Sequence, residues 1–188
     1  MRNVKLSSIA DIYSGLSYRR YLDEEGVNYD VVVQRSIKGD GIIDDFEEVK
    51  LKNNLKERFF SKSGDVLMKM SYPFDVVQIN QEGIVISDRV AIIRLKPNFD
   101  SAFIAHLLTN AHVKKQLHQS GRTEKISHMS IKEIKEISLN IPDYSVQVKY
   151  GNLLNTIDEK IAQDLRVVDY DRRLKEGILN NIWCDIDD

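Results

Sequence analysis

The chain has 188 residues, of which 42% are hydrophobic and 30% charged, a composition typical of a soluble globular protein. This length holds one domain with its own core, or one domain and an appendage. The net charge of −2 neither favours nor excludes a nucleic-acid-binding protein, because acidic segments elsewhere can offset a basic patch. The single cysteine, Cys184, excludes an internal disulfide bond, and no apolar run approaches membrane-spanning length. A cytoplasmic location is therefore expected.

The first half of the chain is predicted to be rich in strands. The segment from Leu6 to Tyr13 favours a short helical turn, which Ser7 or Ser8 caps and Gly15 ends. Short strands are predicted at residues 30–37, 76–79, 83–86 and 90–95, with a turn that feeds a further strand at residues 59–70. The mostly charged residues 42–55 indicate a surface connection.

Helices are predicted to dominate the second half. Ser101 is a good N-cap for a helix that continues to about Gln119 and stops at Gly121. Ser130 caps a second, short helix, and Pro142 closes the apolar run that follows. Because strands come first and helices later, the pattern indicates an α+β fold. Residues 1–142 are expected to form the globular domain, residues 143–183 a long helix, and residues 184–188 an acidic tail.

The predicted long helix carries an apolar seam, in which residues recur at steps of three and four. The seam comprises Leu154, Ile157, Ile161, Leu165 and Val168, and it resumes after residues 171–173 at Leu174, Ile178 and Ile182. A helix of about forty residues is roughly 60 Å long, so part of the seam needs a partner. Asp164 and Arg172 flank it, as charges do when they set the register of a coiled coil. The alternatives are a helix folded back on its own domain, or two helices broken near residues 169–171.

No catalytic or metal site is predicted. His106, His112 and His118 lie six residues apart on one predicted helix and face different ways, whereas zinc ligands must converge. The segment Ser71-Tyr72-Pro73-Phe74 shares part of a loop motif of amino-methyltransferases, but without its first proline or a glycine-rich cofactor-binding turn. A turn between strands is the favoured interpretation. Since no phosphate-binding loop or nucleophile elbow occurs either, we expect a protein that is not an enzyme.

Four segments combine basic residues with aromatic or hydroxyl side chains. They are Tyr18-Arg19-Arg20-Tyr21, then Arg35 with Lys38, then Arg58, Lys62 and Lys69 with Tyr72, and finally Arg122-Thr123-Glu124-Lys125 with Ser127 and His128. Arginine can contact a guanine edge through two hydrogen bonds, and lysine or hydroxyl groups can bind phosphate. On composition alone, such segments are more often solvated surface.

Taken in order, several segments resemble one half of the DNA-specificity (S) subunit of type I restriction–modification systems. Residues 6–15 resemble the opening of that family's target-recognition domain, and residues 63–67 its central Gly-Asp turn. Residues 103–108 resemble the helix that follows, and Gly121 with residues 126–137 the run toward the closing proline. Ile141-Pro142, Gln147 and residues 153–161 resemble the signature that begins the spacer helix, although Val146 stands where a glutamate is usual and the second proline is missing.

The resemblance implies a division of labour between subunits. The S subunit selects the DNA sequence and has no catalytic centre, a methyltransferase (M) subunit methylates adenine, and a motor-nuclease (R) subunit cleaves. S-adenosylmethionine, Mg²⁺ and ATP are accordingly expected on the partner subunits only. One recognition domain with one helix implies a half-size S subunit or a fragment of a full one. A half-size subunit would form a homodimer through antiparallel helices, which restores two recognition domains.

Within this resemblance, double-stranded DNA is the expected ligand, read by arginines and polar side chains in the major groove. The residues expected on the DNA face are Tyr18, Arg19, Arg20, Lys69, Tyr72, Arg122 and Lys125. The alternative function is that of a coiled-coil dimerisation or scaffold protein with no DNA-reading role.

Overall fold

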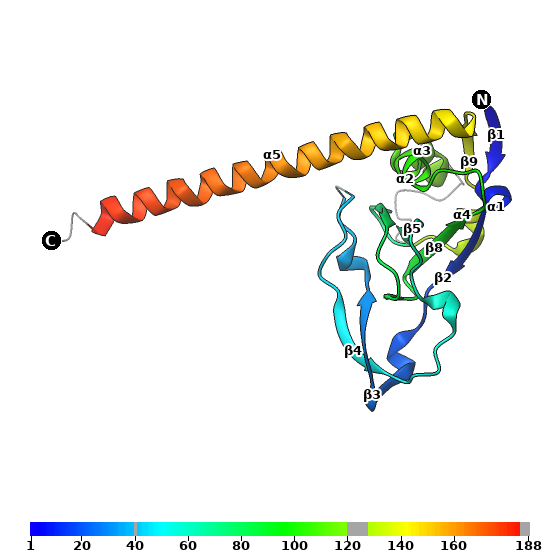
Figure 1. Ribbon diagram of the computed structural model, residues 1–188, viewed down its shortest axis with the longest axis horizontal. Coiled ribbons are helices and arrows are strands. Elements are labelled where there is room, and N and C mark those ends of the chain that lie inside the picture. Colours follow the sequence, from blue (N-terminus) through cyan, green and yellow to red (C-terminus); the bar gives the residue numbers. More distant parts are fainter. Residues whose placement is uncertain (40, 120–127, 185–188) are drawn as a thin grey trace. The chain divides into compact units, whose positions relative to one another are not determined.

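The computed structural model describes residues 1–39, 41–119 and 128–184 (Figure 1). The chain divides into two compact units, Met1–Leu154 and Asn155–Asp188. All the described strands belong to the first unit, which is an α+β domain of mixed sheets, and a long C-terminal helix, α5 (Tyr144–Cys184), follows them in the chain. No helix in the described ranges is long and apolar enough to cross a membrane.

The described strands form three sheets. In chain order they are β1 (Arg2–Lys5), β2 (Ala10–Ser14), β3 (Leu22–Val32), β4 (Glu47–Leu51), β5 (Asp65–Lys69), β6 (Val76–Ile79), β7 (Val85–Ile86), β8 (Val90–Leu95) and β9 (Ser138–Ile141). Antiparallel pairing joins β1 to β9 and builds a four-stranded sheet in the order β2-β8-β5-β6. In the third sheet, ordered β4-β3-β7, β3 pairs antiparallel with β4 and parallel with β7.

The four-stranded sheet is buried on both faces. Successive residues of a strand point to opposite faces, so Val66 and Met68 of β5 join one core cluster while Leu67 joins another. The first cluster includes apolar residues of the helices α1 (Leu6–Ile9), α2 (Ser101–Thr109), α3 (Ala111–Gln119) and α4 (Ile131–Lys135). Each fully buried aliphatic side chain contributes about 1.5–3 kcal/mol to folding. This two-sided burial explains why β5 and β8 are continuous apolar runs rather than alternating ones.

The turn before β5 is held by one buried carboxylate. Gly64 has a φ of +84°, a conformation that glycine adopts without strain. The Asp65 carboxylate accepts hydrogen bonds from Arg94 Nε at 2.8 Å and Nη2 at 2.6 Å, and from the Lys62 backbone N–H at 2.8 Å. The hydrogen bond to Asp65 raises the pKa of the Arg94 guanidinium. The turn and strand predicted at residues 59–70 are therefore confirmed.

Several sequence-based elements differ from those observed. Residues 42–55 contain β4, because charged side chains on one face of a strand can face solvent while Leu51 is buried. The predicted helix from Ser101 divides into α2 and α3 at Asn110, whose side chain accepts a hydrogen bond from His112 N–H at 2.8 Å. Asp100, not Ser101, caps α2 by accepting from the Phe103 N–H at 2.7 Å.

Other elements are confirmed, with changed bounds. Ser130 caps α4 in a reciprocal capping box with Glu133. The strand expected at residues 30–37 begins earlier, since β3 runs from Leu22 to Val32, and a short 3₁₀ turn, η2 (Gln34–Ser36), follows it. Gly121 lies outside the described residues. Helix α5 is continuous through residues 169–173, so the alternative of two helices broken there is wrong.

The first turns of α5 are fastened to the start of α2 by Gln147. Its side chain is 1% exposed; Oε1 accepts from the Asp100 N–H at 3.1 Å, and Nε2 donates to the Pro142 carbonyl at 2.9 Å. Gly151 lies one turn further on, where a Cβ would collide with the Asp100 carboxylate. Both contacts lie within Met1–Leu154 and fix how this part of α5 packs on the domain.

We predict that Gln147→Leu destabilises the domain by about 1–3 kcal/mol, because it leaves the Asp100 N–H and the Pro142 carbonyl without partners. Urea unfolding followed by circular dichroism measures the loss. Gln163→Leu, the same change at an exposed position of α5, is the control and should leave the midpoint nearly unchanged. Equal midpoints for the two variants would contradict a fastening role for Gln147.

Candidate nucleic-acid interface

Three segments that are distant in sequence meet side by side in the first unit. The Leu16 N–H donates to the Ile86 carbonyl at 2.7 Å, and the Asp88 N–H returns a bond to the Leu16 carbonyl at 2.9 Å. The Ser87 N–H donates to the Val32 carbonyl at 3.0 Å. Gly15 permits this approach, because a Cβ there would collide with the backbone of Ile86 and Ser87. The segments that follow β2, β3 and β7 therefore lie side by side and form one continuous surface, which we call the floor.

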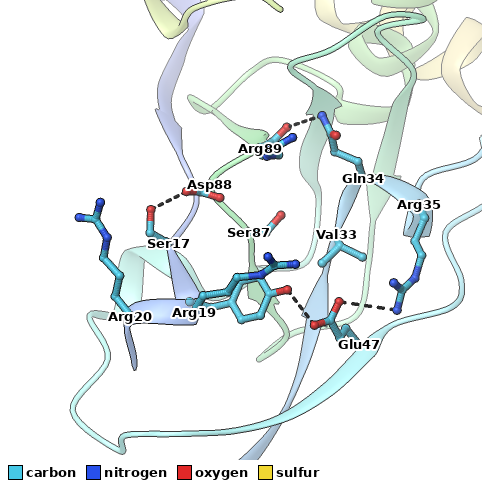
Figure 2. Close-up of a pocket in the computed structure, with 11 residues that line it drawn as sticks. Ser17, Arg19, Arg20, Val33, Gln34, Arg35, Glu47, Ser87, Asp88 and Arg89 are labelled. Atoms are coloured by element: carbon cyan, nitrogen blue, oxygen red, sulfur yellow. Dashed lines mark hydrogen bonds and ion pairs between the residues drawn. The ribbon is translucent and has the colours of Figure 1, made fainter. Parts of the chain in front are cut away.

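A pocket with a volume of about 540 Å³ lies over this floor, and its lining forms a concave surface. Figure 2 shows side chains that reach it from η1 (Tyr18–Tyr21), from η2, from β4 and from the turn between β7 and β8. Its lining residues are Ser17, Tyr18, Arg19, Arg20, Val33, Gln34, Arg35, Glu47, Ser87, Asp88 and Arg89. We call this surface the arginine face, since it gathers Arg19, Arg20, Arg35 and Arg89 with only two carboxylates.

Two of the four arginines lie close to Glu47. Arg35 contacts the Asp45 carboxylate at 3.2 Å and Glu47 at 3.6 Å, while the Tyr18 hydroxyl donates to Glu47 at 2.8 Å. Hydrogen bonding to Tyr18, with the nearby charge of Glu47, raises the pKa of the Arg19 guanidinium. Burial raises the pKa of the Tyr18 hydroxyl, and Glu47 adds to the rise while Arg19 opposes it. Glu47 therefore orders Tyr18 and Arg35 at the edge of the arginine face.

Arg20 and Arg89 are exposed, and within the described ranges their guanidinium groups form no ion pair or hydrogen bond. The Arg89 backbone is nevertheless fixed: its carbonyl accepts from the Met70 N–H at 3.1 Å and from Gln34 Nε2 at 3.3 Å (Figure 2). Gln34 Nε2 also donates to Ser71 Oγ at 2.6 Å. Arg89 thus combines an anchored backbone with donor groups that face solvent.

The structure brings some of the expected DNA-facing residues together and separates others. Tyr18, Arg19 and Arg20 line the arginine face, although Tyr18 is largely buried. Tyr72 is 70% exposed on the turn after β5 and does not line it. Arg122 and Lys125 lie outside the described residues.

Lys69 differs from the other expected residues, because its ammonium group already forms an ion pair with a carboxylate. Lys69 Nζ lies 2.8 Å from Asp75 Oδ2, and the two side chains are only 15% and 10% exposed. Pairing across adjacent strands places Lys69 at the end of β5, near the turn that carries Asp75. A base contact by Lys69 would first require this largely buried pair to open.

Of the arginine-face residues that carry a guanidinium or amide group, the sequence did not single out Gln34, Arg35 and Arg89 as DNA-facing residues. Arg35 and Lys38 formed one of the basic segments, but Gln34 and Arg89 had no local signal. Arg89 follows the strand at residues 85–86 in a turn, and only the pairing of Leu16 with Ser87 carries it beside Arg19. Among the described residues, no three His, Cys, Asp or Glu side chains are placed to hold a metal ion.

The geometry of the arginine face suits recognition of acceptor-rich ligands. Guanidinium and amide groups are planar donors that form paired hydrogen bonds with phosphate oxygens or with the base edges of the major groove. Ser17 and Ser87 add hydroxyl groups beside them. The Ser17 hydroxyl donates to the Asp88 carboxylate, which orients both side chains on the floor (Figure 2).

A family model, the type I restriction modification DNA specificity domain, matches residues 1–168. Three solved structures share the fold. The HsdS subunit from Thermoanaerobacter tengcongensis aligns with a TM-score of 0.69 at 18% identity over 88% of this chain. A chain of a type I R-M system, from work on complex assembly and conformational transition, gives 0.63 at 18% over 86%. The type I S subunit from M. genitalium gives 0.55 at 16% over 86%. No curated protein sequence matches significantly.

The fold and the family model together define a DNA-specificity domain with its C-terminal helix. The chain belongs to the type I restriction–modification DNA specificity domain family. It is accordingly a non-catalytic specificity component and not an enzyme. The chain spans 44%, 39% and 40% of the three matched chains, which is less than half of each.

Proposed function

We propose that the chain is a half subunit for sequence-specific DNA recognition in a type I restriction–modification complex. It acts in the cytoplasm and directs adenine methylation and cleavage by M and R subunits, which carry the S-adenosylmethionine, Mg²⁺ and ATP. The observation that supports this function best is the arginine face, a concave surface with four arginines in a family-matched fold. Guanidinium groups there supply the donors that base edges and phosphates accept.

The near-neutral charge of the chain is compatible with this function. Phosphate contacts dominate the affinity of most DNA-binding proteins, and in a complex they can be shared with the M subunits. The specificity component then needs only a local basic surface. The arginine face supplies one, since four arginines stand there against Glu47 and Asp88.

Self-pairing is the second part of the proposal. In Asn155–Asp188 the side chains of Ile157, Ile161, Leu165, Val168, Leu174, Ile178 and Ile182 are about half exposed. A lone helix in water rarely presents such a continuous apolar seam. Pairing with the helix of a second copy covers it, and a twofold axis then relates two recognition domains. Because both domains are identical, the target is expected to be an interrupted palindrome.

The exposed seam also favours a second candidate, a coiled-coil dimerisation or scaffold protein with no DNA-reading role. Methylome sequencing separates the two candidates. Cells that carry the M subunit with this chain should methylate a bipartite motif, and deletion of the chain should abolish that methylation. An unchanged methylation pattern after deletion would exclude the DNA-specificity function and leave the scaffold.

A further inference from the structure

The turn between β7 and β8 carries an acid and a base side by side on the arginine face. The Val90 N–H donates to the Ser87 carbonyl at 3.0 Å, which closes a β-turn with Asp88 and Arg89 at its two central positions. The Asp88 N–H donates to the Leu16 carbonyl at 2.9 Å, and both central residues are exposed. A fixed backbone therefore presents one carboxylate and one guanidinium group to the same ligand.

Asp88 keeps one carboxylate oxygen free. Its Oδ2 accepts a hydrogen bond from the Ser17 hydroxyl, which fixes the orientation of the carboxylate (Figure 2). Within the described ranges, its Oδ1 accepts no hydrogen bond and forms no ion pair. Glu47, the other acid of the arginine face, differs, because it accepts from the Tyr18 hydroxyl and contacts Arg35. Glu47 thus orders its neighbours, whereas Asp88 holds an oriented acceptor toward the ligand.

A carboxylate on a DNA-binding surface weakens the general attraction to DNA. Phosphate groups and a carboxylate carry like charges, so such an acid lowers the affinity for every sequence. The loss is offset only where the carboxylate meets a hydrogen-bond donor, and the donors that base pairs display in the grooves are exocyclic amino groups. These are N4 of cytosine and N6 of adenine in the major groove, and N2 of guanine in the minor groove. An oriented, free carboxylate is therefore suited to a base edge and unsuited to the phosphate backbone.

We propose that Asp88 is a specificity-determining residue, whose free oxygen accepts a hydrogen bond from the exocyclic amino group of one target base. Ser17 is its positioning residue, because the Ser17 hydroxyl holds the other oxygen. This contact rests on the proposed DNA-specificity function and adds to it the chemistry of one base. A base that presents a carbonyl oxygen or a methyl group at that point leaves the carboxylate desolvated without a donor, so it is rejected.

Asp88→Ala should have opposite effects on target and non-target DNA. Affinity for the target should fall by about tenfold, because the contact with the amino group is lost. Affinity for a random duplex should rise by about twofold or more, because one negative charge no longer opposes the phosphates. An arginine that reads a base behaves differently, since its removal weakens binding to both duplexes. Asp88→Asn keeps the shape of the side chain and should change both affinities in the same directions as alanine does.

Fluorescence anisotropy measures both affinities for the full chain assembled with M subunits, on the target found by methylome sequencing and on a random duplex. Glu48→Ala is the matched control, because Glu48 is exposed on β4 and strand alternation directs it away from Glu47 and the arginine face. It removes the same charge and should leave the ratio of the two affinities unchanged. Ser17→Ala should weaken target binding by a smaller factor than Asp88→Ala and leave random-duplex binding unchanged. Circular dichroism verifies that each variant is folded.

Target duplexes that lack one amino group identify the base. The probes carry 2-pyrimidinone for cytosine or purine for adenine, which remove major-groove amino groups, or inosine for guanine, which removes the minor-groove one. One of these probes should cost the parent about tenfold more affinity than it costs Asp88→Ala, because the variant has already lost the contact. If no probe shows this coupling, or if Asp88→Ala behaves as Glu48→Ala does, the contact is wrong while the DNA-specificity function stands. A parent complex that does not distinguish the target from random DNA would overturn both.

Discussion

Replacing Arg89 with alanine is expected to weaken target binding of the assembled complex by about 1–3 kcal/mol and to relax specificity at one position of the target. Arg89 is the arginine of the arginine face whose backbone is most firmly held, since its carbonyl accepts from both Gln34 and Met70. Its guanidinium group forms no ion pair within the described part of the chain. The anchored backbone adds no ordering cost of its own, so only the rotamer freedom of the exposed side chain is lost when its donors bind.

Two further variants separate base reading from general attraction to DNA. Arg89→Lys keeps the charge but loses the planar pair of donors, so it should relax specificity nearly as much as alanine does. Arg58→Ala is the matched control, because Arg58 stacks over the Phe59 ring at 4.7 Å and does not line the arginine face. Binding is measured by fluorescence anisotropy at several salt concentrations, and specificity by the methylated motif. Equal losses for Arg58→Ala and Arg89→Ala would exclude Arg89 as a base-reading residue.

An element of this structure is predicted correctly from the sequence when the residues that determine it are close neighbours in the chain. Ser130 is a local N-cap signal, and α4 was predicted correctly from it; the structure adds the reciprocal hydrogen bond from the Ser130 N–H to the Glu133 carboxylate. The α2–α3 division was missed because Asn110 fits a helix by pattern alone. In the structure its extended backbone ends α2, and its side chain caps α3 by accepting from the His112 N–H. Strand β4 was missed for a different reason: its charged face conceals the burial of Leu51 against β3.

The candidate interface shows the same limit at longer range. Tyr18, Arg19 and Arg20 are adjacent in sequence, so one basic aromatic segment indicated them together. Arg89 joins them only because Gly15 lets the chain after β2 run beside Ser87, a pairing across about seventy residues. Lys69 shows the opposite case, in which a residue expected at the interface is taken up by another contact. Its residue type suggested a free cation, but the fold places Asp75 next to it as an ion-pair partner. Contact with DNA stays a prediction for all seven expected residues, Tyr18, Arg19, Arg20, Lys69, Tyr72, Arg122 and Lys125.

The long helix was predicted more completely than any other element. Its seam is a repeated local pattern that the sequence shows directly. Its continuity past Asp171 was left open by the sequence and is established by the structure, in agreement with the good helix-forming residues at 172–176. Which surface covers the apolar seam of α5 depends on the complex that the chain forms and not on the chain alone. The single chain reports only that these apolar side chains are exposed.

If α5 pairs with a second copy as proposed, replacing Ile161 with aspartate is expected to convert that dimer into a monomer. Ile161 is the middle residue of the apolar seam from Leu154 to Val168 and is half exposed in the single chain, so the proposed pairing buries it in both copies. An unpaired carboxylate at that position costs several kcal/mol per copy, which raises the dissociation constant by about 100-fold or more. Size-exclusion chromatography with light scattering measures the change.

Val167→Asp provides the matched control for this prediction. Val167 is somewhat more exposed than Ile161, and it points about 120° away from Ile161 around the helix, so the same charge should stay in water and leave the proposed dimer intact. The proposed function adds a second readout: if two paired recognition domains read the target, Ile161→Asp should abolish methylation of a bipartite motif, whereas Val167→Asp should preserve it. Loss of pairing with full retention of bipartite methylation would show that something other than α5 holds the two half-sites in register.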